Sequence, residues 1–152
     1  MSFDLPAKQT GSFELSIDAT PIADKIDGFT GISATAPEAA GVVSVIVRFN
    51  EKGTIDARNG GAFQADQVLG YSANQVYRVR LVVDVAGKAY SVFVAPAGQP
   101  EVLLAKNYAF RTQRAPVQSL TKIVLAGFKS ANGDFGGAHR VTRVSLKAAV
   151  IP

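Results

Sequence analysis

The sequence predicts an all-β protein, built as a two-sheet antiparallel β-sandwich. Three observations support this prediction. Roughly ten short segments alternate apolar and polar residues, which is the period of a strand with one buried face. Residues that favour turns, mainly Gly, Asn, Asp and Pro, separate these segments. No stretch longer than one or two turns has the period of a helix, and strands at this spacing are typical of sandwiches and barrels.

Length and composition indicate one domain with one core. The chain has 152 residues, of which 47% are hydrophobic and 18% are charged. We therefore expect a single domain over residues 1–152, with a loosely ordered lead-in over residues 1–10. The absence of cysteine excludes disulfides, thiol nucleophiles and zinc–cysteine sites, and the single histidine excludes a multi-histidine metal site within one chain. Neither an apolar run of ~18 residues nor a signal-peptide pattern is present, so membrane insertion is not expected.

Several strands are predicted in the first half of the chain. Residues 11–20 show the pattern most clearly, because Phe13, Leu15 and Ile17 alternate with polar and acidic residues. The pair Asn59-Gly60 predicts a tight hairpin, since Asn and Gly tolerate positive φ. The predicted strands cover residues 11–20, 29–34, 42–49, 54–58 and 62–65, and connections over residues 21–28, 35–41 and 50–53 separate them.

Residues 74–97 predict two long strands joined by a tight turn at residues 85–88, and the chain is organised around this hairpin. Four apolar side chains on the first strand, Tyr77, Val79, Leu81 and Val83, alternate with Arg78, Arg80, Val82 and Asp84. Successive side chains of a strand point to opposite faces, so burial of the apolar row places both arginines together on the outer face. That outer row is a candidate binding surface.

The last third of the chain predicts three further strands. They cover residues 101–106, 120–128 and 140–148, with an irregular segment over residues 107–118 and a glycine-rich loop over residues 129–137 between them. The first and last predicted strands both look half-buried. Pairing them within one sheet would place the two ends of the chain side by side, as a jelly roll does.

Charge is distributed unevenly along the chain. The net charge of +4 combines −4 over residues 1–40, +2 over residues 41–100 and +6 over residues 101–152. A basic C-terminal part is compatible with an anionic partner. However, the chain has no Lys/Arg run of about five residues and no recognition-helix pattern, so we do not expect a nucleic-acid partner.

Four segments of the chain resemble a known family of modules. They are IDGFTGIS (26–33), VIVRFNEKGTIDARNGGAF (45–63), YRVRLVVDVAGKAYSVFV (77–94) and NYAFRTQ (107–113). In this succession the chain resembles the concanavalin A-like, laminin G-like modules attached to secreted bacterial polysaccharide lyases and glycoside hydrolases, over roughly residues 11–148. The resemblance implies a two-sheet jelly roll with a concave front sheet that holds sugar chains. It also implies a secreted protein and leaves room for a catalytic domain elsewhere in the parent chain.

The motifs that mark the catalytic members of this superfamily are absent. The hydrolases carry a Glu-x-Asp-x-x-Glu strand, whereas the glutamates here are scattered. The alginate-lyase jelly rolls carry Arg-rich, Gln-x-His and Tyr-x-Lys strands, and none of these occurs in register. The resemblance therefore implies a non-catalytic, lectin-like binding module rather than an enzyme.

Three arginines are the first candidate ligand contacts. Arg48, Arg78 and Arg80 are predicted to project from the outer face of neighbouring strands, and planar guanidinium groups bind carboxylates or sulfates in a bidentate manner. This interpretation predicts a groove for an acidic polysaccharide such as a uronate polymer. In the alternative interpretation, these arginines are solvated or pair with Asp56 and Asp84.

Aromatic residues supply the second group of candidates. Phe93 shares the outer row of its strand and could stack on a sugar ring or lie under a loop. Tyr108, Arg111 and Arg114 lie close together in the irregular segment, where aromatic and guanidinium groups suit sugar contacts. The alternative for this segment is a loop that Phe110 anchors to the core. The lack of Trp argues against a strong carbohydrate platform.

Metal and catalytic chemistry find weaker candidates. Oxygen ligands for calcium could come from Asn132 and Asp134, or from Asp24 and Asp27, but neither pair matches a known loop motif and turn capping explains both. No other cofactor is expected. His139 could act as the base of a β-elimination, with a structural role as the alternative.

Three hypotheses of function follow. The first is a carbohydrate-binding module that holds a polysaccharide on the arginine-bearing face. The second is a polysaccharide lyase or glycoside hydrolase with an unrecognised site. The third is a laminin G-like adhesion module with a protein partner, which predicts a large exposed apolar patch.

Overall fold

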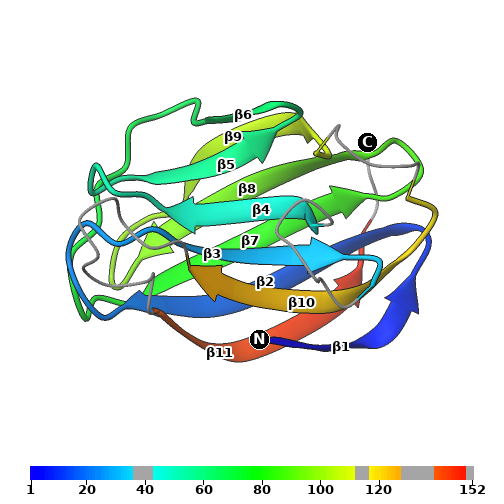
Figure 1. The fold of residues 1–152 in the computed structure, drawn as a ribbon, viewed down its shortest axis with the longest axis horizontal. Helices are drawn as coiled ribbons and strands as arrows, with labels where there is room; N and C mark the ends of the chain where they lie inside the picture. The colour runs from blue at the N-terminus through cyan, green and yellow to red at the C-terminus, as the bar shows by residue number, and fades with distance from the viewer. Residues whose placement is uncertain (36–42, 112–116, 128–138, 150–152) are drawn as a thin grey trace.

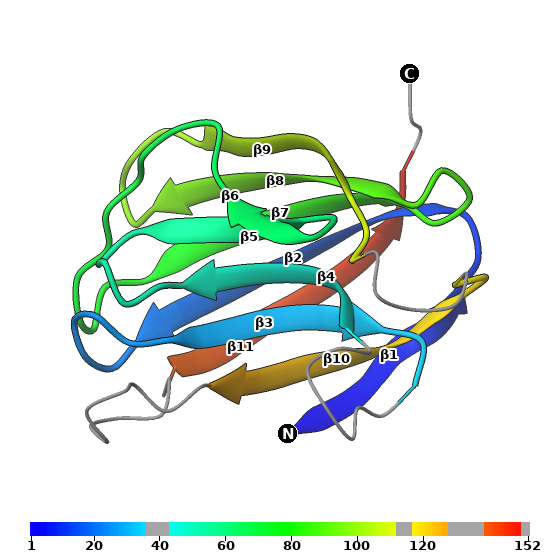
Figure 2. The same ribbon diagram turned by 45° about the horizontal axis from the view of Figure 1, so that its top comes forward.

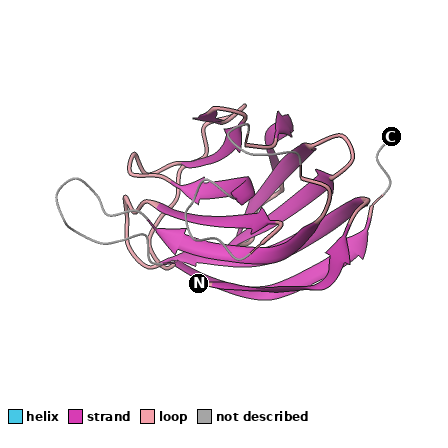
Figure 3. Cartoon of the chain, turned by 45° about the vertical axis from the view of Figure 1, so that its right-hand side comes forward, coloured by secondary structure: helices cyan, strands magenta, loops and turns pink. Residues whose placement is uncertain are grey.

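The computed structural model describes residues 1–35, 43–111, 117–127 and 139–149. Every regular element in these ranges is a strand (Figure 3). The strands form two antiparallel sheets that lie face to face (Figures 1 and 2). The predicted all-β sandwich is therefore confirmed. None of the described ranges forms a helix that is long and apolar enough to cross a membrane.

Eleven strands make up the two sheets in the described residues. The six-stranded sheet has the order β1-β10-β3-β4-β5-β6, and the five-stranded sheet has the order β11-β2-β7-β8-β9. The strands are β1 (Ser2–Gln9), β2 (Ser12–Pro21), β3 (Gly28–Ser33), β4 (Val43–Phe49), β5 (Ile55–Asn59), β6 (Ala62–Gln64), β7 (Tyr77–Asp84), β8 (Ala89–Pro96), β9 (Val102–Ala109), β10 (Leu120–Gly127) and β11 (His139–Ala148).

Strands from the two ends of the chain pair with each other, as predicted. The β2 strand lies between β11 and β7, and it pairs with β11 from Phe13 opposite Ala148 to Pro21 opposite His139. Figure 1 shows this as the blue and red strands running side by side. The chain passes from one sheet to the other between β1 and β2 and again between β10 and β11, as in a jelly roll.

The prediction of a loosely ordered lead-in over residues 1–10 is wrong. Residues 2–9 form the edge strand β1, which pairs with β10. Leu5 anchors this strand in the core with 5% of its surface exposed. Pro6 suggested an irregular segment. An edge strand tolerates proline where the backbone N–H has no ladder partner, and the β1–β10 pairing is irregular between Asp4 and Gln9.

The central hairpin behaves as the alternation predicts. Burial alternates residue by residue along β7 and again along β8. Val79 and Leu81 are buried between the sheets, whereas Arg78 and Arg80 are partly exposed on the outer face. Each fully buried aliphatic side chain of this row contributes about 1.5–3 kcal/mol to stability, so the core determines which face carries the arginines.

Strand β9 is longer than predicted, because a bulge breaks its alternation. The prediction ended it at residue 106, but it continues to Ala109. Asn107 adopts a positive φ of 53°, and the register with β8 shifts between Tyr90 and Val92. Ala105 and Tyr108 are therefore both buried although two residues separate them.

Candidate functional site

The three predicted arginines lie on different sheets. Arg48 is on β4 in the six-stranded sheet, whereas Arg78 and Arg80 are on β7 in the five-stranded sheet. Their side chains therefore belong to opposite outer faces of the sandwich. The prediction that neighbouring strands carry all three on one surface is wrong. Alternation determines whether a side chain points in or out, but it does not assign a strand to a sheet.

Each of these arginines pairs with carboxylates. Arg48 donates from Nε and Nη2 to the two carboxylate oxygens of Asp56, at 2.9 and 2.8 Å. This is the pair that the alternative interpretation predicted. Arg78 pairs with Asp18 at 2.9 Å. The predicted partner Asp84 is instead used locally, where its Oδ1 accepts a hydrogen bond from the backbone N–H of Gly87 at 2.9 Å.

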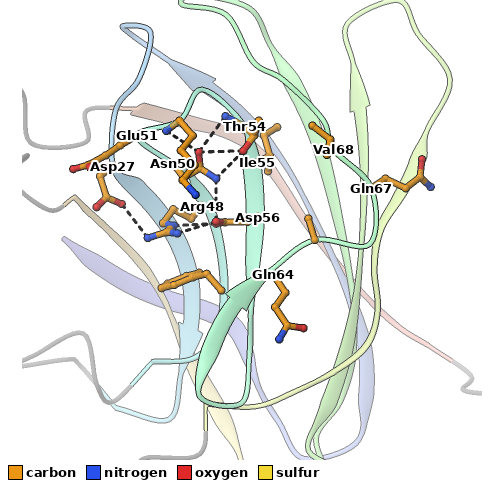
Figure 4. A pocket seen from close by; sticks show the side chains of 13 residues that line it. Asp27, Arg48, Asn50, Glu51, Thr54, Ile55, Asp56, Gln64, Gln67 and Val68 are labelled. Atoms are coloured by element: carbon orange, nitrogen blue, oxygen red, sulfur yellow. Dashed lines mark hydrogen bonds and ion pairs between the residues drawn. The ribbon is translucent and has the colours of Figure 1, made fainter.

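A pocket of about 430 Å³ opens on the outer face of the six-stranded sheet, over β4, β5 and β6 (Figure 4). The lining is mixed: charged and amide side chains occupy one side, and apolar side chains complete it. The lining residues are Asp27, Arg48, Asn50, Glu51, Lys52, Thr54, Ile55, Asp56, Phe63, Gln64, Ala65, Gln67 and Val68.

Local folding places the polar groups of this pocket opposite one another. Arg48 and Asp56 are cross-strand partners on β4 and β5, so their side chains share one face. Asn50 lies in the turn between these strands, where its Oδ1 accepts backbone hydrogen bonds from Lys52 and Thr54 at 3.0 and 3.1 Å. Its Nδ2 donates to Asp56 Oδ2 at 2.9 Å. Figure 4 shows Arg48, Asn50 and Asp56 converging as one network.

An aromatic ring stands beside this network. Phe63 lies on the short edge strand β6 and is half-buried. The Arg48 guanidinium carbon lies 3.6 Å from the centre of this ring, and that of Arg58 lies 5.1 Å from it. The pocket therefore combines a flat apolar surface with fixed hydrogen-bonding groups, the combination that small-molecule sites use.

The electrostatics of the pocket are slightly negative. Its lining includes three carboxylates (Asp27, Glu51, Asp56) and two cations (Arg48, Lys52). Burial, opposed by Arg48 and reinforced by Glu51 and Asp56, raises the pKa of Asp27 above its ordinary value. The Oδ1 atom of Asp27 is buried without a hydrogen-bond partner and lies 3.6 Å from Arg48 Nη1. The pocket is therefore poorly suited to a carboxylate or sulfate ligand.

The remaining predicted contacts are dispersed. Phe93 lies on the outer face of β8, half-buried, with the Arg80 guanidinium carbon 4.0 Å from its ring centre. Tyr108 faces the core with 3% of its surface exposed, so its predicted role as a surface contact is wrong. Its hydroxyl donates to Asp66 Oδ1 at 2.9 Å. The Arg111 N–H donates to the Ser44 carbonyl at 3.0 Å, and Arg114 lies outside the described residues.

Candidate metal and catalytic residues have other partners. Asp24 Oδ1 accepts a hydrogen bond from the Ala73 N–H at 2.8 Å. Over the described ranges, no group of three or more His, Asp or Glu side chains is arranged to hold a metal ion. Asn132 and Asp134 lie outside these ranges. His139 Nε2 lies 3.0 Å from Thr30 Oγ1, at the start of β11.

Sequence reasoning missed Phe63, Asn50 and the site-forming role of Asp56. A usable signal was present. Asp56 follows Arg48 by eight residues across a predicted turn, and Asn59-Gly60 predicts that Phe63 returns beside them. Pairing three consecutive strands in this segment places the side chains of Arg48, Asp56 and Phe63 on one face of the sheet.

Comparison with known proteins finds a similar sequence and several solved structures of similar fold. No protein-family model matches it. A protein named gellan lyase, from a Bacillus species, is 34% identical over 129 residues, which are 82% of this chain and 5% of that protein. The chain thus spans a small part of that protein's length.

Two solved structures share the fold. The catalytic domain of a glycoside hydrolase family 131 protein from Coprinopsis cinerea superposes with a TM-score of 0.57 at 14% identity, over 93% of this chain and 58% of that one. Galectin-Ib from Xenopus laevis superposes with a TM-score of 0.51 at 10% identity, over 97% of this chain and 98% of that one. At such identities the likeness concerns the fold alone. It confirms a jelly-roll sandwich of the concanavalin A-like type.

Proposed function

We propose that this chain is a non-catalytic carbohydrate-binding module that holds a sugar residue of a polysaccharide in the β4–β6 pocket. The observation that carries the proposal is the Arg48–Asp56–Asn50 network beside the Phe63 ring. Sugars present hydroxyls around an apolar ring face. Fixed guanidinium, carboxylate and amide groups can bind the hydroxyls while the aromatic ring packs against the C–H face.

The hydrogen-bonding state of Arg48 and Asp56 favours binding. Arg48 commits Nε and one Nη2 hydrogen to Asp56, and its Nη1 group faces the pocket at 3.6 Å from Asp27. Asp56 accepts three hydrogen bonds, from Arg48 twice and from Asn50 once. A carboxylate has about four acceptor positions, so one remains for a sugar hydroxyl. Both groups are held in place before a ligand arrives, which lowers the entropic cost of binding.

The same contacts argue against general acid–base catalysis. A carboxylate pair that cleaves a glycosidic bond must reach the bond from both sides. Asp27 has only 14% of its side chain exposed, and its Oδ1 is buried. Asp56 is occupied by Arg48 and Asn50. We therefore assign Asp27 to positioning Arg48, and Asp56 to positioning Arg48 and accepting a hydrogen bond from a sugar hydroxyl.

The chemistry of the pocket favours a neutral sugar. Its carboxylates outnumber its cations, and an added anion would be repelled. The relative's name supports a polysaccharide as the ligand, since gellan is a polymer of sugars. Polysaccharides are met outside the cell. We therefore propose a secreted, bacterial module in a parent chain that also carries a catalytic domain.

The test is affinity electrophoresis followed by calorimetry, using gellan, hydroxyethylcellulose, dextran and polygalacturonate. We expect the wild-type chain to bind at least one polysaccharide that contains neutral sugars. Phe63→Ala should weaken this binding about two- to tenfold, because an aromatic contact contributes about 0.5–1.5 kcal/mol and 1.4 kcal/mol is a factor of ten. Phe63→Tyr, which keeps the ring, should retain binding.

Phe3→Ala is the matched control, since Phe3 lies on β1 and is partly exposed away from the pocket residues. It should leave the affinity unchanged. Thermal unfolding of each variant shows whether the fold is intact. Binding by folded Phe63→Ala that equals wild type, or no retardation by gellan, hydroxyethylcellulose or dextran, would contradict the proposal.

A further inference from the structure

A second cavity, of about 700 Å³, lies on the outer face of the five-stranded sheet. Six of its lining residues carry the argument: Glu14, Arg80, Ser91, Phe93, Lys106 and Lys147. We infer that this cavity is a second saccharide site, which takes a uronate-bearing sugar chain through its carboxylates. The inference rests on the proposed function only in assuming that the ligand is a polysaccharide, because the two sites share no residue.

The acidic groups on this face lie close to the sheet, and cationic groups cover them on the solvent side. Glu14 and Asp18 on β2 are largely buried, with 15% and 13% of their side chains exposed. Each lies between two cations, one on β7 and one on β11. Glu14 pairs with Arg80 at 3.3 Å and Lys147 at 3.4 Å, and Asp18 pairs with Arg78 at 2.9 Å and Arg143 at 3.6 Å. The outermost charge is therefore positive.

The balance of charge differs from that of the first pocket. The lining of this cavity includes three cations (Arg80, Lys106, Lys147) and one carboxylate (Glu14). Lys147 and Arg143 extend furthest, with 72% and 81% of their side chains exposed. Lys106 is exposed on the edge strand β9. A positive surface raises the local concentration of anionic ligands and speeds their association.

An apolar surface beside these cations suits a sugar ring. Phe93 lies under Arg80, which leaves its ring partly exposed to the cavity, and Val82 and Leu103 line the same hollow. Ser91 Oγ accepts a hydrogen bond from the Asn107 N–H at 3.0 Å and retains a donor. Lys106 on β9 and Lys147 on β11 stand at opposite edges of the sheet, so each can pair with a different carboxylate of a sugar chain that lies across this surface.

The arrangement favours a polysaccharide over a nucleic acid. Single strands bind through several aromatic faces that stack successive bases. Here the described part of the cavity lining has one aromatic ring, and Arg80 already covers one side of it. Without a row of stacking faces, the surface recognises charge and an occasional apolar ring, which a uronate polymer supplies.

The experiment measures retention in native gels that contain polygalacturonate. We expect the double variant Lys106→Gln/Lys147→Gln to bind polygalacturonate roughly fivefold more weakly, since exposed charge contacts are individually modest. The matched control is Lys8→Gln/Lys25→Gln, which removes the same charge from exposed lysines elsewhere. It should retain the wild-type affinity within about twofold.

Two outcomes would overturn the inference. One is equal weakening in both double variants, which would mean that only the net charge matters. The other is equally tight, Lys106- and Lys147-dependent retention by single-stranded oligothymidylate of similar length, which would identify an unselective polyanion surface. Phe63→Ala should leave polygalacturonate retention unchanged, so failure of the β4–β6 pocket and failure of this site are distinguishable.

Discussion

Tyr71 joins two sides of the β4–β6 pocket through one buried hydroxyl. This hydroxyl accepts a hydrogen bond from the Ile26 N–H at 2.8 Å and donates one to the Asn50 carbonyl at 2.7 Å. Ile26 precedes Asp27, and Asn50 orients Asp56. Removing the hydroxyl with Tyr71→Phe therefore tests whether the pocket is assembled before a ligand arrives.

The cost can be worked out from the partners that remain. The Asn50 carbonyl also accepts from the Gly53 N–H at 3.0 Å, so it stays satisfied. The buried Ile26 N–H loses its hydroxyl partner, which costs about 1–3 kcal/mol, and loss of the donated bond adds about 0.5–1.5 kcal/mol. We expect Tyr71→Phe to lower the free energy of unfolding by about 1.5–4.5 kcal/mol.

The assay is urea unfolding, with Tyr77→Phe as the control. The Tyr77 hydroxyl accepts from the Ser72 N–H at 2.8 Å and donates to Gln75 Oε1 at 3.2 Å, but both bonds are only partly buried. Water can replace them, so the control should cost about 1 kcal/mol. A Tyr71→Phe effect no larger than that of Tyr77→Phe would refute the reasoning. Under conditions where it remains folded, Tyr71→Phe should also bind neutral polysaccharide more weakly.

Three further predictions concern the same sandwich. Because the pKa of Asp27 is raised in the folded state, protonation of this carboxyl stabilises the fold at low pH, and the stabilisation is lost as pH rises through the folded pKa. Asp27→Asn should therefore have a higher free energy of unfolding than wild type near neutral pH, as measured by urea unfolding. All four tyrosines have raised pKa values, mainly through burial, to about 12 for Tyr71 and Tyr108, so phenolate absorbance should stay low through pH 10 and rise only at higher pH or on unfolding. A phenolate signal with a midpoint near 10 in the folded protein would contradict this. Gly31→Ala should lower the unfolding midpoint, at a cost of about 1–3 kcal/mol, because the added Cβ would overlap Val43 Cγ1 and lie 2.7 Å from the Val45 carbonyl oxygen. The control is Gly11→Ala, where no atom lies within 4 Å of the added Cβ. Equal midpoints for the two variants would show that the strands move apart freely.

Alternation in the sequence was sufficient to predict most strands and their buried faces. The β7 segment shows why: Tyr77, Val79 and Leu81 are buried and Arg78 and Arg80 are not, because burying apolar surface outweighs any other local preference. The same rule carries no information about which sheet receives a strand. Arg48 and Arg80 both point outward, yet they lie on opposite faces of the molecule.

Failures of the pattern have local causes. The bulge at Asn107 puts Tyr108 into the core, because a residue with positive φ interrupts the two-residue period. Edge strand β1 was missed because Pro6 usually ends a strand, although an edge tolerates it. The pocket depends on the pairing of three strands, and single-strand patterns do not contain that pairing.

The two candidate sites are independent consequences of one architecture. A jelly-roll sandwich assigns its inward side chains to packing, so the outer faces of the two sheets can carry different chemistry without disturbing the core. One face holds a slightly negative pocket with the Phe63 ring, and the other holds buried carboxylates under exposed cations. The salt dependence of binding should distinguish the two sites. Screening weakens contacts between exposed charges over about 10 Å at 0.1 M, so polygalacturonate binding should fall with added salt. Binding of a neutral sugar beside Phe63 depends on hydrogen bonds and apolar contact, and it should stay nearly constant over the same range. A salt dependence shared equally by both ligands would mean that they occupy one surface.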